Sequence, residues 1–176
     1  MEIEKVGIVG CGLMGSGIAE LSARSGYSTM VSEASAEFLD KGLAALGSSL
    51  SKGVARHKLT EADRDAALGR IKGTTNLADL KDCDLVIEAI VEDMEIKKKV
   101  FAQLDEVCTE GALLATNTSC LSIIEMAMAT RRPGQVLGIH FFNPAPVMKL
   151  AELVKTIATS DETIETARAF AESLGK

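Results

Sequence analysis

The chain has 176 residues, of which 47% are hydrophobic and 25% charged, a composition typical of one globular domain with a sizeable core. The formal net charge of −6 and an aromatic content of 3%, without tryptophan, argue against nucleic acid as the main partner. No apolar run approaches the length of a membrane span, and the first residues already belong to a predicted strand. We therefore expect no membrane partner, no leader peptide and a cytoplasmic location.

The cysteines are candidates for a metal or disulfide framework, but their spacing does not favour one. The four of them form no Cys-x-x-Cys pair and have no histidine at ligand spacing. They are therefore expected to be reduced, mostly buried thiols of an intracellular protein. The sequence predicts no metal site.

The first motif joins a strand to a helix through glycines. Residues 3–9 form an apolar, β-branched run that predicts a buried strand, and the pattern Gly10-x-Gly12-x-x-Gly15 then opens a helix. A dinucleotide fingerprint requires this order of elements. Gly10 would make the tight turn, Gly12 would admit a pyrophosphate to the helix N-terminus, and Gly15 would let the helix pack on the strand.

The second predicted strand, residues 27–32, leads into Glu33, which lies 18 positions after Gly15. A carboxylate near this spacing accepts hydrogen bonds from the adenosine ribose and repels a 2′-phosphate. No lysine or arginine lies between Glu33 and Asp40. The pattern favours NAD over NADP, and the alternative is a nucleotide-free α/β core with a glycine turn.

Strand-like and helix-like segments alternate along the chain, which predicts a largely parallel sheet. Two helical segments precede the weak third strand at 71–75: residues 34–55, interrupted by three glycines, and residues 60–69, with a capping-box-like pattern. They are longer than a crossover needs and could project as a hairpin. The basic residues near its tip suggest a solvated charged face; they are Lys52, Arg56 and Lys58.

The strongest strand candidate is 83–91, which carries Glu88 and leads into Glu92 at the edge where open α/β sheets bind ligands. Asp93 is expected to cap the helix at 94–108. Lys97 lies in the first turn of that helix, where a cation opposes the helix dipole unless it serves an anion or a polar ligand. Pairing of Glu92 with Lys97 is the structural alternative.

A fifth strand is predicted at 112–115, followed by a polar loop that contains Asn117 and Ser119. The side chains of both residues should face the cleft at the nicotinamide end, although Asn117 could instead serve only its own turn. Ser122 and Glu125 have the spacing of a capping box for the next helix.

The strand predicted at 135–142 carries His140 near its end, and two prolines then stiffen the loop. Residues 150–156 can return as an antiparallel strand, which would bring Glu152 beside His140. A lone strand histidine is commonly a core residue. Here the carboxylate would orient the imidazole and stabilise its protonated form, so the two residues together could act as a general base.

These motifs resemble the NAD-binding domain of the 3-hydroxyacyl-CoA dehydrogenase family, which includes the bacterial 3-hydroxybutyryl-CoA dehydrogenases. The resemblance covers essentially the whole chain. It implies a Rossmann-type, doubly wound α/β fold with a mostly parallel sheet, a helical hairpin after the second strand and an antiparallel last strand. The motifs that carry it are Gly10-Cys11-Gly12-Leu13-Met14-Gly15, Val86-Ile87-Glu88-Ala89-Ile90-Val91-Glu92, Asn117-Thr118-Ser119 and His140-Phe141-Phe142-Asn143-Pro144.

The resemblance also implies residue roles. His140 would take the proton of the substrate 3-hydroxyl, Glu152 would pair with His140, and Ser119 would hydrogen-bond the reacting oxygen of an acyl-CoA substrate. Ser49 and Arg56 align with positions that contact the coenzyme A portion. Glu33 replaces the more usual aspartate. The implied NAD-binding residues are Gly10, Cys11, Gly12, Leu13, Met14, Gly15, Glu33, Glu92, Lys97, Asn117, Ser119 and Asn143.

Residues 1–176 correspond to the NAD-binding domain alone. In the family a helical domain follows, supplies an active-site asparagine, closes over the substrate and builds the dimer. We therefore expect the chain to bind NAD but to turn over weakly or not at all. Two alternatives stay open: an NAD-dependent dehydrogenase of a non-CoA hydroxy acid, such as a sugar acid or carnitine, and a non-catalytic nucleotide-binding module.

Overall fold

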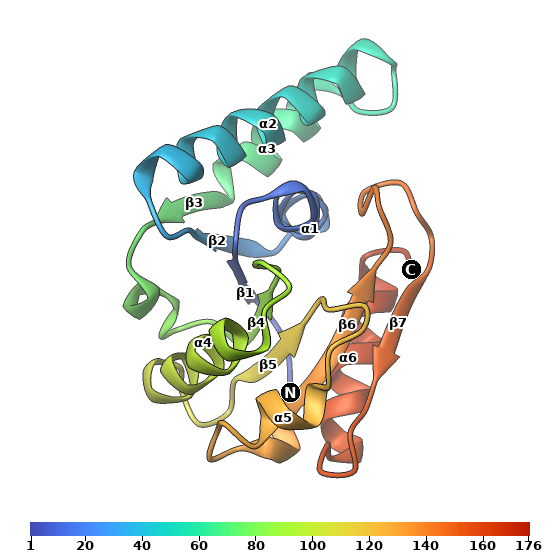
Figure 1. Cartoon of the computed structure of the whole chain (residues 1–176). Helices are drawn as coiled ribbons and strands as arrows, with labels where there is room; N and C mark the ends of the chain where they lie inside the picture. Colours follow the sequence, from blue (N-terminus) through green and yellow to red (C-terminus); the bar gives the residue numbers. More distant parts are fainter.

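The computed structural model describes all 176 residues and is built on one seven-stranded sheet (Figure 1). Helices cover both faces of this sheet, and two short 3-10 helices, η1 and η2, complete the connections. The elements are β1 Lys5–Val9, α1 Leu13–Arg24, β2 Ser28–Ser32, α2 Ala36–Ala55, α3 Glu61–Gly69, β3 Ile71–Thr74, η1 Leu77–Leu80, β4 Leu85–Glu88, α4 Met94–Val107, β5 Leu113–Thr116, α5 Ile123–Ala127, η2 Pro133–Gln135, β6 Val136–Phe141, β7 Ala151–Val154 and α6 Asp161–Ser173.

The strand order is β3-β2-β1-β4-β5-β6-β7. The first six strands are parallel, and β7 runs antiparallel to β6. The predicted doubly wound, mostly parallel sheet with an antiparallel last strand is confirmed. The chain leaves β1 toward β2 on one side and later returns to β4 on the other. The topological switch point, where such folds bind ligands, therefore lies between β1 and β4.

The core has one layer on each face of the sheet, because successive strand residues point to opposite sides. Ile8, Ile87 and Ile139 pack on the face covered by α1, α2, α3 and α6. Val86 and Leu114 pack on the face covered by α4 and α5. Burial on both faces explains why the central strands read as nearly continuous apolar runs. None of the helices combines the length and apolar character that crossing a bilayer requires.

The predicted helical hairpin forms from α2 and α3, and the far end of α2 extends beyond the sheet (Figure 1). The capping box of Thr60 and Asp63 is present at the start of α3. The predicted glycine interruptions of α2 are wrong, since the helix is continuous. Gly42 has a packing role instead: a Cβ there would lie 2.3 Å from the Sγ of Cys11, so only glycine lets α2 approach the turn after β1 this closely.

Two other local predictions need correction. The strand predicted at 83–91 ends at Glu88, because the Ile90 N–H donates to the Glu88 carboxylate, at 2.7 Å, instead of continuing the ladder. Glu92 therefore lies in the loop before α4. Ser122 precedes α5 but its side chain caps nothing, and the Glu125 N–H donates to the Ser122 carbonyl, so the predicted capping box is absent.

Candidate active site

The turn after β1, residues 10–15 and here called the fingerprint turn, has the geometry that its glycines predict. Gly10 has φ +96°, and a Cβ there would lie 2.7 Å from the Ala89 carbonyl oxygen. A Cβ on Gly15 would lie 1.8 Å from the Gly10 carbonyl oxygen, whereas Gly12 has nothing within 4 Å. Helix α1 begins after Gly12 with no side-chain cap and no acid in its first turn. Its first N–H groups are therefore available to an anion.

A cavity of about 690 Å³, here called the cofactor cleft, opens beside the fingerprint turn. This volume lies within the usual range for small-molecule sites, and Gly10, Gly12 and Glu33 line its polar side. The apolar wall of the cofactor cleft was not predicted from the sequence. Its residues come from three separate segments of the chain, so they form no local sequence pattern. Its members are Phe38, Leu77, Ile90, Val91, Ile96 and Val100.

Glu33 lies at the rim of the cofactor cleft with both carboxylate oxygens oriented by the backbone. One oxygen accepts from the Cys11 N–H at 2.8 Å and the other from the Ala34 N–H at 2.7 Å. Each carboxylate oxygen has a second lone pair, so Glu33 can still accept from a ribose diol. Cys11 presents only its backbone to this site: burial, with a smaller contribution from Glu33, raises the pKa of its thiol to about 11.

The cation in the first turn of α4 is neutralised by carboxylates. The Lys97 Nζ lies 2.5 Å from Glu88 and 3.2 Å from Glu92, and the Lys97 side chain is 1% exposed. The pairing of Glu92 with Lys97, which the sequence left open as the structural alternative, is therefore present. Partial burial acts to raise the pKa of Glu92, but hydrogen bonds from Thr118 and Lys97 outweigh burial and lower it. Direct contact of Lys97 or Glu92 with NAD stays a prediction.

His140 and Glu152 are the residues predicted to be catalytic and are here called the catalytic pair; they face each other across β6 and β7. They occupy directly opposite positions in the antiparallel register, as predicted. The His140 Nδ1 lies 2.8 Å from the Glu152 carboxylate, and the two side chains are 19% and 52% exposed. The ring of Phe142 packs at 4.6 Å from the imidazole. A donor bond from Nδ1 to the carboxylate leaves the Nε2 lone pair free to accept a proton.

Asn117, Ser119 and Asn143 lie on the loops that follow β5 and β6. The Asn117 side-chain oxygen accepts from the Phe141 N–H at 2.8 Å. Asn117 thus ties the end of β5 to the strand that carries His140, rather than closing its own turn. Ser119 and Asn143 are exposed. Their roles toward cofactor and substrate stay predictions.

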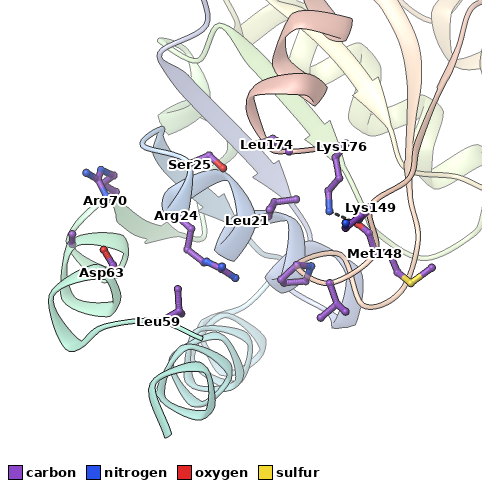
Figure 2. A pocket seen from close by; sticks show the side chains of 14 residues that line it. Leu21, Arg24, Ser25, Leu59, Asp63, Arg70, Met148, Lys149, Leu174 and Lys176 are labelled. Carbon is purple, nitrogen blue, oxygen red and sulfur yellow. Dashed lines mark hydrogen bonds between the residues drawn. The ribbon is translucent and has the colours of Figure 1, made fainter. Parts of the chain in front are cut away.

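Ser49 and Arg56 lie on the exposed surface of α2 and at its C-cap, and neither lines the cofactor cleft. A second cavity, of about 510 Å³, separates α1 and α3 from the loop after β6 (Figure 2). Its Lys176 donates to the carbonyls of Ala145 and Met148, at 2.6 and 2.5 Å. These bonds fasten the end of α6 to the loop that follows β6. Ser49 and Arg56 do not line this second cavity.

The sequence matches, over residues 5–176, the family described as "3-hydroxyacyl-CoA dehydrogenase, NAD binding domain". The 3-hydroxybutyryl-CoA dehydrogenase of Mycobacterium tuberculosis is 48% identical in an alignment of 176 positions that covers 99% of this chain and 62% of that protein. The crystal structure of (S)-3-hydroxybutyryl-CoA dehydrogenase from Ralstonia eutropha superimposes with a TM-score of 0.97 at 44% identity, covering 99% of this chain and 62% of that one.

A more distant solved structure is that of a diketoreductase, described as acting on dicarbonyl compounds. It is 29% identical with a TM-score of 0.88, and the match covers 99% of this chain and 62% of that one. The chain therefore spans about three fifths of the length of these relatives. The fingerprint turn, the cofactor cleft and the family match agree, and the chain belongs to the 3-hydroxyacyl-CoA dehydrogenase family, of which it is an NAD-binding domain.

Proposed function

We propose that this chain is the cofactor-binding half of an NAD-dependent dehydrogenase that interconverts (S)-3-hydroxyacyl-CoA, such as 3-hydroxybutyryl-CoA, and 3-oxoacyl-CoA. The observation that carries the proposal is the catalytic pair, a histidine and a carboxylate 2.8 Å apart at the carboxyl end of β6. It lies at the same sheet edge as the fingerprint turn, because β1 and β6 are parallel members of one sheet. The names of the two 3-hydroxybutyryl-CoA dehydrogenases support the choice of substrate.

In the proposed oxidation, NAD supplies the hydride acceptor, and the chain handles the proton. The Nε2 of His140 accepts the proton of the 3-hydroxyl group, because Nδ1 is engaged by Glu152. The carboxylate then stabilises the imidazolium that forms and holds the ring in position. The hydroxyl of Ser119 would donate to the reacting oxygen. In the reverse direction His140 returns the proton to the 3-oxo group.

The site is open to water, which bears on how fast the chain can turn over. Glu152 is 52% exposed, and Ser119 and Asn143 are exposed as well. Water in an exposed site screens the charges of the catalytic pair, and such a site contacts the substrate from one side only. We therefore expect NAD binding together with slow turnover for the 176-residue chain.

Binding and single-turnover measurements test the proposal. The NADH-loaded chain should bind acetoacetyl-CoA in calorimetry and oxidise NADH slowly at high protein concentration. The variant His140→Ala should keep NADH binding and abolish the oxidation. Binding of NADH without either binding or reduction of acetoacetyl-CoA would refute the acyl-CoA assignment and favour a non-catalytic module.

A second candidate is a dehydrogenase of a carbonyl or hydroxy compound without coenzyme A. The similarity to the diketoreductase supports it, because a related domain is reported to serve dicarbonyl compounds. A dicarbonyl compound without coenzyme A and free acetoacetate, tested beside acetoacetyl-CoA in the same assay, distinguish the two candidates. The substitutions Ser49→Ala and Arg56→Ala should weaken only the coenzyme A ligand if the first candidate is right.

A further inference from the structure

A buried ionic group lies beneath the wall of the cofactor cleft, and neither the fingerprint turn nor the catalytic pair includes it. It consists of Glu88, Lys97 and Glu92, here called the charge triad. Glu88 is fully buried and Lys97 is 1% exposed, whereas the Glu92 side chain is 40% exposed. We propose that Glu88 acts through this triad to set the preference of the site for oxidised over reduced cofactor.

The contacts of Glu88 suit a carboxylate and offer no acceptor for a carboxyl proton. One oxygen accepts from the Lys97 ammonium at 2.5 Å and from the Ile90 N–H at 2.7 Å. The other accepts from the Thr116 hydroxyl at 2.7 Å. That hydroxyl oxygen accepts in turn from the Thr118 N–H, which directs its proton toward Glu88. Every neighbour therefore donates, and Glu88 contributes a full negative charge.

The charge triad consequently holds two carboxylates and one ammonium, a net charge of −1. It lies at the topological switch point: Glu88 is opposite Val9 on one side and Thr116 on the other, so one neighbouring strand leads into the fingerprint turn. Ile90, which the Glu88 carboxylate holds through its N–H, lines the cofactor cleft. Burial reduces solvent screening, so this charge acts at longer range than a surface acid.

A net negative charge distinguishes the two redox forms, because the oxidised nicotinamide ring is cationic and the reduced ring is neutral. The charge triad should therefore stabilise bound NAD⁺ more than bound NADH. A purely structural Glu88 would behave differently. Its loss would disturb the cleft wall and weaken both forms by the same factor, leaving their ratio unchanged.

The test is the ratio of the dissociation constants of NADH and NAD⁺, measured by calorimetry on the 176-residue chain. Glu88→Gln keeps the shape and removes the charge, and it should lower this ratio about three- to tenfold. A tenfold change corresponds to about 30 mV in the potential of the bound two-electron couple. Glu88→Asp keeps the charge and should restore the ratio.

Glu95→Gln is the matched control. Glu95 lies on α4, the helix that carries Lys97, but it is exposed and paired with Lys98. It should leave the ratio unchanged. A ratio for Glu88→Gln that matches the unmodified chain would overturn the inference.

Thermal unfolding shows whether Glu88→Gln folds. If it does not, Glu92→Gln removes the same unit of charge from the exposed end of the triad and should lower the ratio as well; an unchanged ratio there overturns the inference equally. No substrate enters these measurements, so the result does not depend on the acyl-CoA proposal. Failure of the unmodified chain to bind either redox form would instead remove the cofactor site on which the inference rests.

Discussion

Glu33 provides the sharpest test of how this domain selects its cofactor. Its two oxygens are oriented by the N–H groups of Cys11 and Ala34, and one lone pair on each stays free. We expect those two lone pairs to accept the two hydroxyls of the adenosine ribose. Glu33→Gln leaves one oxygen and replaces the other with an NH₂ donor, so it cannot satisfy both backbone donors and the diol together.

The expected magnitude follows from the bonds that this substitution removes. A hydrogen bond to a charged group contributes about 1.5–3 kcal/mol, and the half-buried position of Glu33 favours the lower end. The affinity for NAD⁺ should therefore fall about 10- to 30-fold. Near a protein surface, two like unit charges about 5 Å apart repel by roughly 3 kcal/mol. Removing the carboxylate should thus lower the ratio of the NADP⁺ dissociation constant to the NAD⁺ dissociation constant by at least about tenfold.

Calorimetric titration of NAD⁺ and NADP⁺ into the unmodified chain and the variant measures both effects. Glu37→Gln is the control, because it removes the same charge from an exposed acid in the first turn of α2. It should change neither affinity by more than about twofold. Unchanged NAD⁺ affinity in Glu33→Gln, with undiminished exclusion of NADP⁺, would refute the assignment of Glu33 to the ribose.

Three further predictions concern the catalytic pair and the fold. Glu152→Gln should slow single-turnover oxidation of NADH by acetoacetyl-CoA about 100-fold or more while NADH affinity stays unchanged, and equal rates would contradict its role. Gly42→Ala places a Cβ 2.3 Å from the Cys11 Sγ and should cost about 1–3 kcal/mol in urea unfolding, whereas Gly47→Ala, with nothing within 4 Å, should not destabilise. Asp105→Asn removes the charge of a buried carboxylate that pairs with the largely buried Arg132 and with the exposed Arg131, and it should cost about 3–5 kcal/mol, mainly through the buried Arg132 pair. Burial acts to raise the pKa of Asp105, but the arginine hydrogen bonds outweigh it and lower the pKa. The stabilisation by ionised Asp105 is therefore complete above its unfolded pKa of about 4, and it is lost as the pH falls through the lower pKa of the folded state. Urea unfolding at several pH values measures this. The unmodified chain should lose this part of its free energy of unfolding at acid pH, and Asp105→Asn should not.

The features predicted well from the sequence are those with a local pattern. The fingerprint turn follows from glycine spacing between a strand and a helix, and the pairing of His140 with Glu152 follows from two prolines that return the chain. The charge triad was only partly predictable, because nothing in the spacing of Glu88 and Lys97 says that the lysine folds back onto the strand. The partners of Asp105 lie 26 and 27 residues away, and only the packed helices bring them together.

The placement of the site residues also decides what kind of ligand could use all of them. Glu33 follows β2, Glu92 follows β4, Ser119 follows β5 and His140 lies one residue before the end of β6. The strands β2-β1-β4-β5-β6 are successive neighbours in the sheet. Four strand spacings separate the first of these strands from the last, roughly 19 Å at about 4.8 Å each. A mononucleotide bound at the fingerprint turn would leave the catalytic pair without a partner. A dinucleotide extended along the carboxyl edge, with its adenosine at Glu33, can bring a second nucleoside to His140. The position of the catalytic pair at β6 therefore fits a dinucleotide and not a mononucleotide.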